Sequence, residues 1–297
     1  MKVPYLKILL SLSTIYICSS YSDENLNAGY AKLLALSLTD DISASTLHAE
    51  GFNYEKYSLP YEFKDLYVID DYSFSMQLKG NYLKVKSSLV NIDSLGNLRA
   101  RWDIFSLSAS PKVSYQINEK FSLENELELG YANMSNNSTF HGSQQMKDVL
   151  RDEGLLDWNV NSFHITPKLG LRNTNILDNN DELNLYGHIS YMFTNGFGKT
   201  KGLNVNSSTG TWSIGGEYVM TELISINDIN FNLILSNDIG GFYGKDYREL
   251  SFGFINNTSV ALETPINIYD NQVKVKAGIG YLSSDNAHGI ALTLGIR

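Results

Sequence analysis

The chain has 297 residues, with 23 Lys and Arg against 32 Asp and Glu and a formal net charge of −9 at pH 7. This acidic balance argues against a nucleic-acid partner. Nineteen Tyr, 13 Phe and 23 Gly beside only five Pro favour a strand-rich chain over a helical one.

The N-terminus has the features of an export signal. Two lysines precede an apolar stretch that ends at Ile17, and small residues follow it. We therefore predict a cleavable signal peptide over residues 1–22, cut after Ser20 or Ser22. The apolar stretch has only about half of the length that a single transmembrane anchor needs. Cleavage would remove the one cysteine, Cys18, so neither a disulfide nor thiol chemistry is available to the mature chain.

A short helical segment is expected after the signal peptide. Between Glu24 and Leu38, leucine and tyrosine residues recur at helical spacing, with alanines between them. Asp40 and Asp41 end this pattern. We assign residues 23–40 to an N-terminal helical segment.

Two weak strand candidates, Ile42–Ala49 and Tyr57–Lys64, come next, and the first clear strand begins at Tyr72. From there every second residue is apolar and the others are polar, which is the period of an amphipathic strand. The phase of the pattern changes near Gly80, before apolar residues continue to Leu89. We interpret the change as a bulge within one long strand.

The hairpin that follows predicts a polar lumen. Residues 105–131 alternate apolar with polar side chains on both sides of a short turn. The second strand presents Glu124, Glu126 and Glu128 on one face, and three glutamates in a row cannot form a hydrophobic core. In a membrane barrel they would face the lumen or the rim, where water and basic groups such as Lys112 solvate them.

The remaining strands complete the count. They are expected at residues 163–171, 183–193, 212–220, 229–235 and 250–262, followed by a terminal hairpin of Val273–Tyr281 and Ile290–Arg297. The hairpin has an apolar face and a face of Lys, Gly and Thr. The sequence thus predicts ten clear strands, and twelve with the two weaker candidates.

The connections between strands tend to alternate in length. Asn133–Asp157 and Asn195–Ser208 are long and rich in Asn, Ser and Gly, whereas Asn118–Lys120 and Thr221–Asp228 are short. Long loops on one side and short turns on the other are typical of outer-membrane barrels. Parity then places the C-terminus, and the N-terminus for an even strand count, on the short-turn side, which is the periplasm.

The predicted fold class is all-β: a transmembrane antiparallel β-barrel over residues 41–297, with about 12 strands and 10 as the alternative. A soluble secreted sandwich or jelly roll would also show alternating strands. The length of the strands and the lipid-type side chains on one face of nearly every strand favour the barrel. We therefore expect a place in the cell outer membrane, with outer-membrane lipid as the surrounding partner.

The order of these elements resembles the translocator barrels of autotransporters, and more narrowly the solitary outer-membrane autotransporter-like barrels, which have no passenger. Three stretches carry the likeness: Ala31–Ser45, Leu59–Phe63 and Val275–Arg297. The resemblance implies twelve strands, insertion by the barrel insertion machinery, and the segment Glu24–Leu38 inside or under the pore. Outer-membrane strands usually end in an aromatic residue, and this chain departs from that pattern because it ends in Arg297.

Acidic pairs and Ser/His groups offer only weak catalytic candidates. Asp40–Asp41 and Asp70–Asp71 could activate water, with His48 nearby in sequence. Asp is also common where helices end and chains turn, which is the simpler interpretation of both pairs.

A second candidate lies in the last hairpin turn, where Ser283, Ser284, Asp285 and His288 come together. Four residues in one tight turn rarely reach the separated geometry that a nucleophile, base and orienting acid require. We expect them to be solvated loop residues.

No other motif nominates a site. His141, His164 and His188 are scattered, without the spacing of metal ligands. The glycine-rich stretches Asn195–Lys199 and Gly240–Gly244 lack the strand-to-helix context of a phosphate loop, and we expect them to be loops on the long side. We therefore nominate no catalytic, cofactor-binding or metal-binding residue and expect neither a cofactor nor an enzyme.

The favoured function is a monomeric outer-membrane barrel without cargo in its own chain, with a structural, interaction or transport role. A porin or small-solute channel is the alternative, because charged side chains in the lumen would set ion selectivity. The residues concerned are Glu124, Glu126, Glu128, Arg172, Lys274 and Lys276. A surface protease or lipase is the third hypothesis.

Overall fold

The computed structural model describes residues 44–49, 51–92, 96–152, 155–197, 206–226, 229–244, 253–268 and 271–296. The expected signal peptide, the helical segment expected over residues 23–40 and Arg297 lie outside these ranges. Asp40 and Asp41 lie outside them as well.

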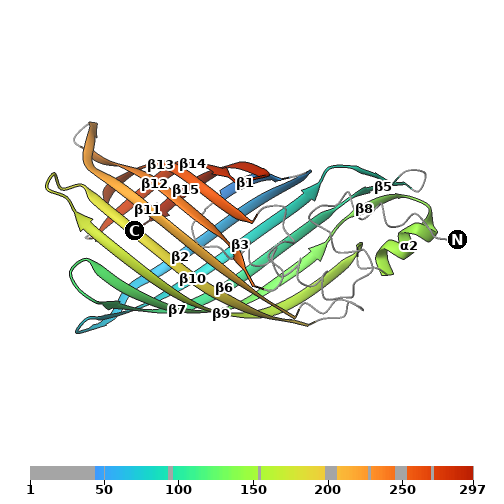
Figure 1. The fold of residues 1–297 in the computed structure, drawn as a ribbon, viewed down its shortest axis with the longest axis horizontal. Coiled ribbons are helices and arrows are strands. Elements are labelled where there is room, and N and C mark those ends of the chain that lie inside the picture. Colours follow the sequence, from blue (N-terminus) through green and yellow to red (C-terminus); the bar gives the residue numbers. More distant parts are fainter. Residues whose placement is uncertain are drawn as a thin grey trace.

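Twelve strands form one closed antiparallel barrel, in which neighbours in the sequence pair with each other and β1 pairs with β15 (Figure 1). This confirms the predicted fold class and the higher strand count, and it excludes the soluble sandwich. The strands are β1 (Ala44–Ala49), β2 (Phe52–Ile69), β3 (Tyr72–Ser87), β6 (Arg101–Gln116), β7 (Phe121–Asn136), β9 (Trp158–Ile176), β10 (Glu182–Phe197), β11 (Ser207–Ile226), β12 (Ile229–Tyr243), β13 (Phe254–Ile268), β14 (Asn271–Ser283) and β15 (Ala287–Ile296).

A small folded unit, which we call the cap, extends beyond one end of the barrel (Figure 1). It consists of the three-stranded sheet β4 (Val90–Ile92), β5 (Gly96–Arg99) and β8 (Thr139–Gly142), together with helix α2 (Gln144–Asp152). The hydroxyl of Ser143 accepts a hydrogen bond from the Met146 backbone N–H at 3.3 Å, which caps the start of α2. No helix in the described part of the chain has the length and apolar character to cross a membrane.

The two ends of the barrel differ in their connections. Short turns join β2 to β3, β6 to β7 and β9 to β10 at one end, the short-turn end. The cap and the long connections from β10 to β11 and from β12 to β13 belong to the other, the long-loop end, which also holds the tight β1–β2 and β14–β15 turns. The direction of β1, which runs toward the long-loop end, and that of β15, which runs toward the short-turn end, agree with the predicted parity of the termini.

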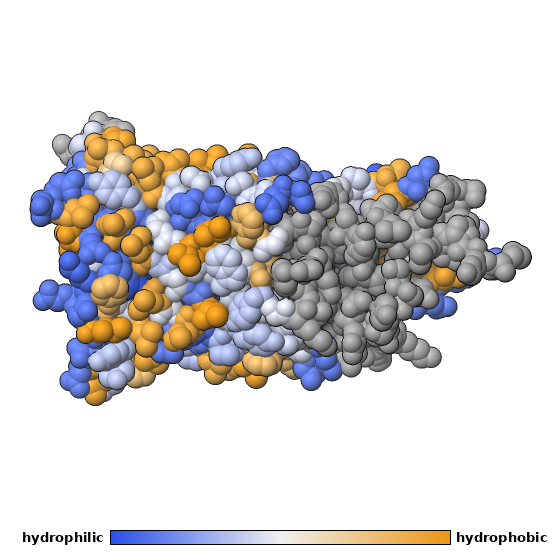
Figure 2. All heavy atoms as spheres, viewed as in Figure 1, coloured by the Kyte–Doolittle hydropathy of each residue, from blue (hydrophilic) through white to orange (hydrophobic). Residues whose placement is uncertain are grey.

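Successive side chains on the barrel strands alternate between the lumen and the outer surface. Leu59 and Leu107 point outward and are 79% and 53% exposed, whereas their neighbours Ser58 and Ser106 are 4% and 0% exposed. Figure 2 shows the resulting hydrophobic residues spread over the barrel wall, with hydrophilic residues gathered at the edge of the short-turn end. A band of outward-facing apolar side chains, contributed by alternate residues of each strand, is the surface that lipid requires.

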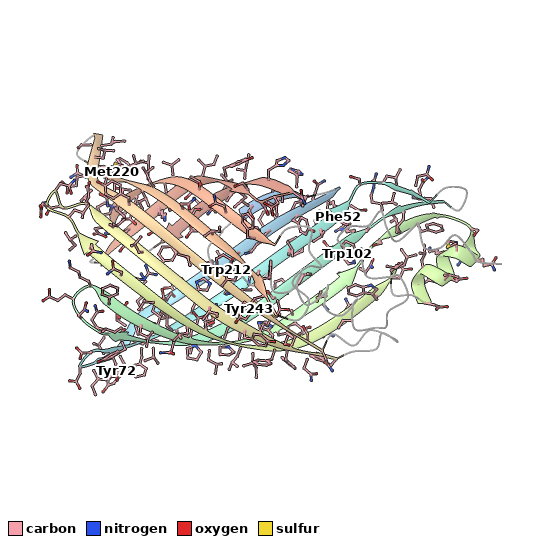
Figure 3. All side chains as sticks on the ribbon, in the orientation of Figure 1. Phe52, Tyr72, Trp102, Trp212, Met220 and Tyr243 are labelled. Atoms are coloured by element: carbon pink, nitrogen blue, oxygen red, sulfur yellow. The ribbon has the colours of Figure 1, made fainter. Side chains whose placement is uncertain are left out.

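Aromatic side chains border this band near both ends. At the long-loop end Tyr57 stacks on Tyr82, with ring centroids 6.3 Å apart. At the short-turn end Tyr72 contacts Tyr115 at 4.8 Å, and Figure 3 places Tyr72 far from the cap. Two such girdles are typical of the two interfaces of a membrane barrel.

The bulge predicted near Gly80 is wrong. Gly80 pairs in unbroken register with Leu59 on one side and Leu107 on the other. The phase changes because the apolar face moves from the outside of the barrel to its inside, with Leu78 exposed and Leu83 fully buried. The register shift of this region lies in β2 instead, before its last residues.

Two loop predictions also need correction. Gly240–Tyr243 and Asn195–Phe197 are parts of strands β12 and β10, not loops. Glycines on β12 fit the crowded wall, since a Cβ on Gly240 would lie 2.9 Å from the Trp212 carbonyl oxygen. The predicted start of the next strand was early as well, because β13 begins at Phe254.

Candidate functional site in the barrel lumen

Apolar side chains fill the long-loop half of the lumen. Phe52 stacks on Trp102 with ring centroids 6.0 Å apart, and both lie near the cap in Figure 3. They belong to one contiguous buried cluster. The barrel wall contributes Leu47, Ala49, Phe52, Tyr54, Leu83, Val85, Trp102, Ile104, Ala132, Met134, Trp158, Val160, Met192, Phe242, Leu282, Ala287 and Ala291.

The cap packs into the same cluster. Met146 and Leu150 lie one helical turn apart on one face of α2 and are buried, whereas Val149 on the other face is 43% exposed. Leu98 of β5 and Phe140 of β8 are buried with them. The cap therefore packs against the barrel wall through a continuous apolar core.

Charged side chains take over toward the middle of the lumen. Glu128 lies 2.8 Å from the Lys79 ammonium and 3.1 Å from that of Lys168, and its other oxygen is 3.3 Å from Nε2 of His164. Lys79, Glu128 and His164 are at most 1% exposed in their side chains. Opposite charges in direct contact offset the large cost of burying each one.

A second ion cluster lies closer to the short-turn end. The Lys112 ammonium is 3.2 Å from Glu124 and 3.6 Å from Glu62, and Arg172 is 3.3 Å from Glu124. The guanidinium of Arg172 also lies over the ring of Tyr186, 5.4 Å from its centroid. The predictions that the glutamates face the lumen and that Lys112 solvates them are confirmed.

The opposite wall carries a third cluster. Lys276 contacts Glu217 at 2.8 Å, with both side chains 9% exposed, and Lys274 lies 3.6 Å from Glu263. Asn232 donates a hydrogen bond to Glu263 at 3.3 Å. The lysines predicted to face the lumen do so, and their acidic partners come from neighbouring or facing strands that the sequence did not connect.

A cavity of about 160 Å³ lies between the two walls. Its apolar side includes Leu47, Leu83 and Phe242, which are part of the apolar cluster. Its polar side includes His188 and Ser213. The cavity thus sits where the apolar half of the lumen meets the polar half.

The polar side of this cavity holds hydrogen-bonded groups. Ser213 Oγ is 2.9 Å from Nδ1 of His188 on the adjacent strand. Tyr186 donates a hydrogen bond to Asp238, which also lines the cavity. Hydroxyl, imidazole and carboxylate groups therefore line this side of the cavity. Sequence spacing gave no signal for this set because three strands supply it.

The acidic pairs weighed in the sequence do not form a site with His48. Asp70 and Asp71 form the β2–β3 turn at the short-turn end, where Asp70 has a positive φ of 48°. His48 lies on β1 near the long-loop end and contacts Asn53. The length of β2 therefore separates the two groups.

The Ser-Asp-His turn is a turn in the structure too. Ser284 donates a backbone hydrogen bond to the Ala287 carbonyl at 2.8 Å, which closes the β14–β15 connection. His288 is exposed and pairs across the hairpin with Ser283.

The histidines are spread over the molecule. His141 is in β8 of the cap, whereas His164 and His188 face the lumen from β9 and β10. In the ranges that the structure describes, no three His, Cys, Asp or Glu residues come together as a metal site.

Comparison with known proteins gives one family. The model of the solitary outer membrane autotransporter beta-barrel domain matches residues 40–261. No curated protein sequence matches the chain.

Solved structures of autotransporter barrels have a similar fold at low sequence identity. The translocator domain of NalP from Neisseria meningitidis is 11% identical with a TM-score of 0.56, over 96% of this chain and 98% of that one. The β domain of the Bordetella autotransporter Brka is 11% identical with a TM-score of 0.55, over 86% and 95%. The transport unit of AIDA-I from Escherichia coli is 14% identical with a TM-score of 0.51, over 94% and 99%.

Proposed function

Because the chain belongs to the solitary outer membrane autotransporter β-barrel family, whose place is the bacterial outer membrane, we propose that it is a closed barrel that presents its cap at the cell surface. In this proposal the long-loop end is extracellular and the short-turn end is periplasmic, as in other outer-membrane barrels. The role is one of interaction at the surface, not of free diffusion through the pore.

One observation carries the proposal: the apolar cluster runs without interruption from the barrel wall into the cap. A mobile gate would be expected to have polar, solvated contacts with the wall. Met146, Leu150 and Trp158 are instead 7%, 6% and 4% exposed. Packing of this kind favours a cap that stays folded in the mouth.

Conductance across a planar bilayer tests the closure. Replacing Met146 and Leu150 by Asp places two carboxylates in the apolar cluster and should detach α2, so the double variant should conduct more than the unmodified protein. Val149→Asp is the matched control, since it adds a charge on the exposed face of the same helix. Free conductance by the unmodified protein would refute the closed barrel.

The orientation can be tested on intact cells. The only cysteine lies within the expected signal peptide, so a single introduced cysteine reports on its own position. A membrane-impermeant maleimide should label Val149→Cys on intact cells and Asp71→Cys only after the outer membrane is permeabilised. The reverse pattern would invert the proposed orientation.

The charged half of the lumen favours a second candidate, a small-solute channel. Ion clusters such as Lys112, Glu124 and Arg172 line the lumen near its periplasmic opening. Lumen charges of this kind set the selectivity of a pore. If the protein conducts, Glu124→Gln should shift its preference from cations toward anions, and an unchanged preference would count against the channel.

The segment Glu24–Leu38 is proposed to act from the periplasmic side, inside or under the pore. Its deletion should raise conductance, and combining the deletion with the Met146→Asp/Leu150→Asp variant should raise it further. If the deletion variant and the unmodified protein conduct equally, the segment does not help to close the pore, and the cap alone closes it.

Three further parts of the proposal concern partners and chemistry. The barrel is proposed to be inserted by the barrel insertion machinery and to be monomeric, which light scattering of the detergent-solubilised protein would check. It is also proposed to have no enzymatic activity. A protease or lipase activity that His188→Ala or Ser213→Ala abolishes would refute that part, because these groups contact each other in the lumen cavity.

A further inference from the structure

A row of nitrogen-bearing side chains crosses five adjacent strands on the outer face of the barrel. In the strand register, His288 of β15 is paired with His48 of β1, His48 with Asn53 of β2, Asn53 with Lys86 of β3, and Lys86 with Arg101 of β6. The row crosses the β1–β15 closure, so it exists only in the closed barrel. We call His288, His48, Lys86 and Arg101, with Lys84 below them, the basic rim.

The basic rim lies just beyond the lipid-facing band on the extracellular side. Tyr57, Tyr82 and Phe105 are paired with one another in the same way and belong to the aromatic girdle. Lys86 is four residues beyond Tyr82 on β3, which is roughly 13 Å along the strand and about 9 Å along the membrane normal for a strand tilted by about 45°. The aromatic girdle marks the level at which the lipid head groups begin, so the basic rim lies within or at the outer edge of the head-group region.

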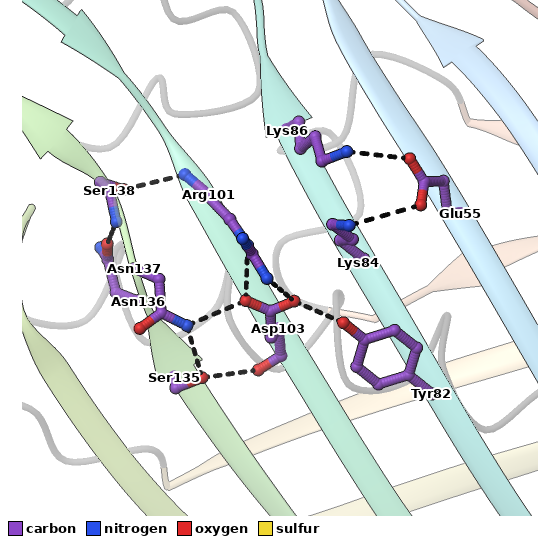
Figure 4. A network of polar contacts seen from close by, with 10 residues as sticks. All are labelled: Glu55, Tyr82, Lys84, Lys86, Arg101, Asp103, Ser135, Asn136, Asn137 and Ser138. Carbon is purple, nitrogen blue, oxygen red and sulfur yellow. Dashed lines mark hydrogen bonds and ion pairs between the residues drawn. The ribbon is translucent and has the colours of Figure 1, made fainter.

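The basic rim is held in place by two carboxylates (Figure 4). Glu55 lies 3.2 Å from the Lys86 ammonium and 3.7 Å from that of Lys84. Asp103 lies 2.8 Å from Nε of Arg101. Two acids thus orient three cations and leave the group with an excess of positive charge.

Arg101 and Lys86 are the most exposed of the five charged groups. The Arg101 and Lys86 side chains are 44% and 39% exposed, whereas Asp103 is only 13% exposed. Asp103 also accepts hydrogen bonds from Tyr82 at 2.6 Å and from Asn137 at 2.9 Å. The acid is therefore engaged on several sides, while the guanidinium and ammonium groups remain accessible from the membrane surface.

Two turns of the periplasmic rim have the opposite character. The β2–β3 turn carries Asp70 and Asp71, and the β9–β10 turn carries Asp178 and Asp181. An anion in the membrane surface would therefore meet attraction at the extracellular rim and repulsion at these periplasmic turns. The asymmetry points to a ligand of the outer leaflet.

From this arrangement we propose that the basic rim binds the phosphate groups of a phosphorylated glycolipid in the outer leaflet. Arg and Lys are the side chains that pair most strongly with phosphate, and the exposed imidazoles of His48 and His288 and the amide of Asn53 add donors along the same row. The acyl chains of such a lipid would lie against Tyr57, Leu59 and Leu107, which are exposed below the rim. This binding is independent of whether the pore is open or closed.

The test is a titration of the folded full chain in detergent with bisphosphorylated lipid A, followed by native mass spectrometry. Lys86→Gln/Arg101→Gln should weaken binding by at least about tenfold, because charge-assisted hydrogen bonds to phosphate are lost. Lys64→Gln/Lys120→Gln removes the same charge from the periplasmic side and should bind as the unmodified protein does. Heat-modifiable migration in gels checks that both variants are folded.

Four comparisons decide whether the basic rim recognises the lipid phosphates. Dephosphorylated lipid A should bind the unmodified protein at least about tenfold more weakly, since the same charge-assisted hydrogen bonds are absent, and inorganic phosphate should not compete at equal concentration. Equal binding of the dephosphorylated lipid, or displacement by inorganic phosphate, would overturn the proposal. An equal loss in the Lys64→Gln/Lys120→Gln control would also overturn it, because total charge and not the basic rim would then explain the affinity. The pair Lys86→Arg/Arg101→Lys should retain binding, and its failure to bind would contradict recognition through positive charge.

Discussion

The two halves of the lumen share one wall and differ in what lines it. The long-loop half is filled by apolar side chains such as Trp102 and Trp158, and the short-turn half is lined by ion pairs such as Lys276–Glu217. An inward-facing position on a barrel strand therefore does not by itself require a polar residue. Where loops fold into the mouth, the lumen is packed like the core of a water-soluble domain.

The largest effect is expected from breaking the apolar half. Trp102 is 3% exposed and stacks on Phe52, so Trp102→Ala should lower the free energy of unfolding by about 3–5 kcal/mol. Urea unfolding in lipid vesicles measures the loss. Trp102→Phe keeps most of the apolar contact and should lose far less, and equal losses would show that the cluster is not closely packed.

The ion pairs of the short-turn half should respond in opposite ways to single and double replacement. Lys276→Met removes the ammonium that contacts Glu217 and should cost about 3 kcal/mol, because a buried charge loses an oppositely charged contact. Lys276→Met/Glu217→Leu should recover much of that loss. If the double variant loses as much unfolding free energy as the two single variants together, the pair is not coupled.

The border between the halves can be tested with one methyl group. A Cβ on Gly130 would lie 2.2 Å from the His164 ring and 3.0 Å from the Leu107 carbonyl oxygen. Gly130→Ala should therefore destabilise the barrel by about 1–3 kcal/mol, since the ring beside Glu128 must move. Adding His164→Ala should relieve part of this cost, and thermal unfolding of the single and double variants would reveal it.

The smallest effect is expected outside the lumen, at the β9–β10 turn. A hydrogen bond from Tyr218 at 2.6 Å, and one from the Thr221 backbone at 3.0 Å, lower the pKa of Asp181 below its ordinary value of 3.8. A depressed pKa stabilises the folded turn above pH 3.8, and this contribution is lost as the pH falls through the folded-state pKa.

Hydrogen exchange of the turn amides below pH 4 measures that loss. Relative to the intrinsic exchange rate at each pH, the turn amides of the unmodified protein should exchange faster as the pH is lowered. Asp181→Asn should lack the additional pH dependence. An identical pH profile in the variant would assign the effect to another group.

The architecture could be predicted because strand alternation is local. Glu124 and Glu128 are on one strand, and the period of two alone places both on the inner face. The partners of Glu128, which are Lys79 and Lys168, come from other strands, and only the register brings them together. The pairing of His164 with Glu128 was not predictable for the same reason.

The cap and the apolar half of the lumen escaped prediction for a different physical reason. Along β3, exposed Leu78 gives way to buried Leu83 and Val85. Alternation of apolar and polar residues does not distinguish a strand face that meets lipid from one that meets a packed interior. If every apolar residue is expected to face lipid, the change of phase near Gly80 is interpreted as a bulge. Helix α2 has nine residues inside a long polar connection, too few for a periodic signal to stand out.

The fluorescence of the three tryptophans of the chain can distinguish the apolar cluster in the lumen from the lipid-facing surface. Trp102 and Trp158 are 3% and 4% exposed within the apolar cluster, whereas Trp212 is on the outer row with lipid-facing Ile189. Brominated acyl chains should quench the emission of Trp212 alone, and aqueous iodide should reach none of the three until the cap detaches. Intrinsic fluorescence thus reports whether the cap closes the long-loop end, without any added label.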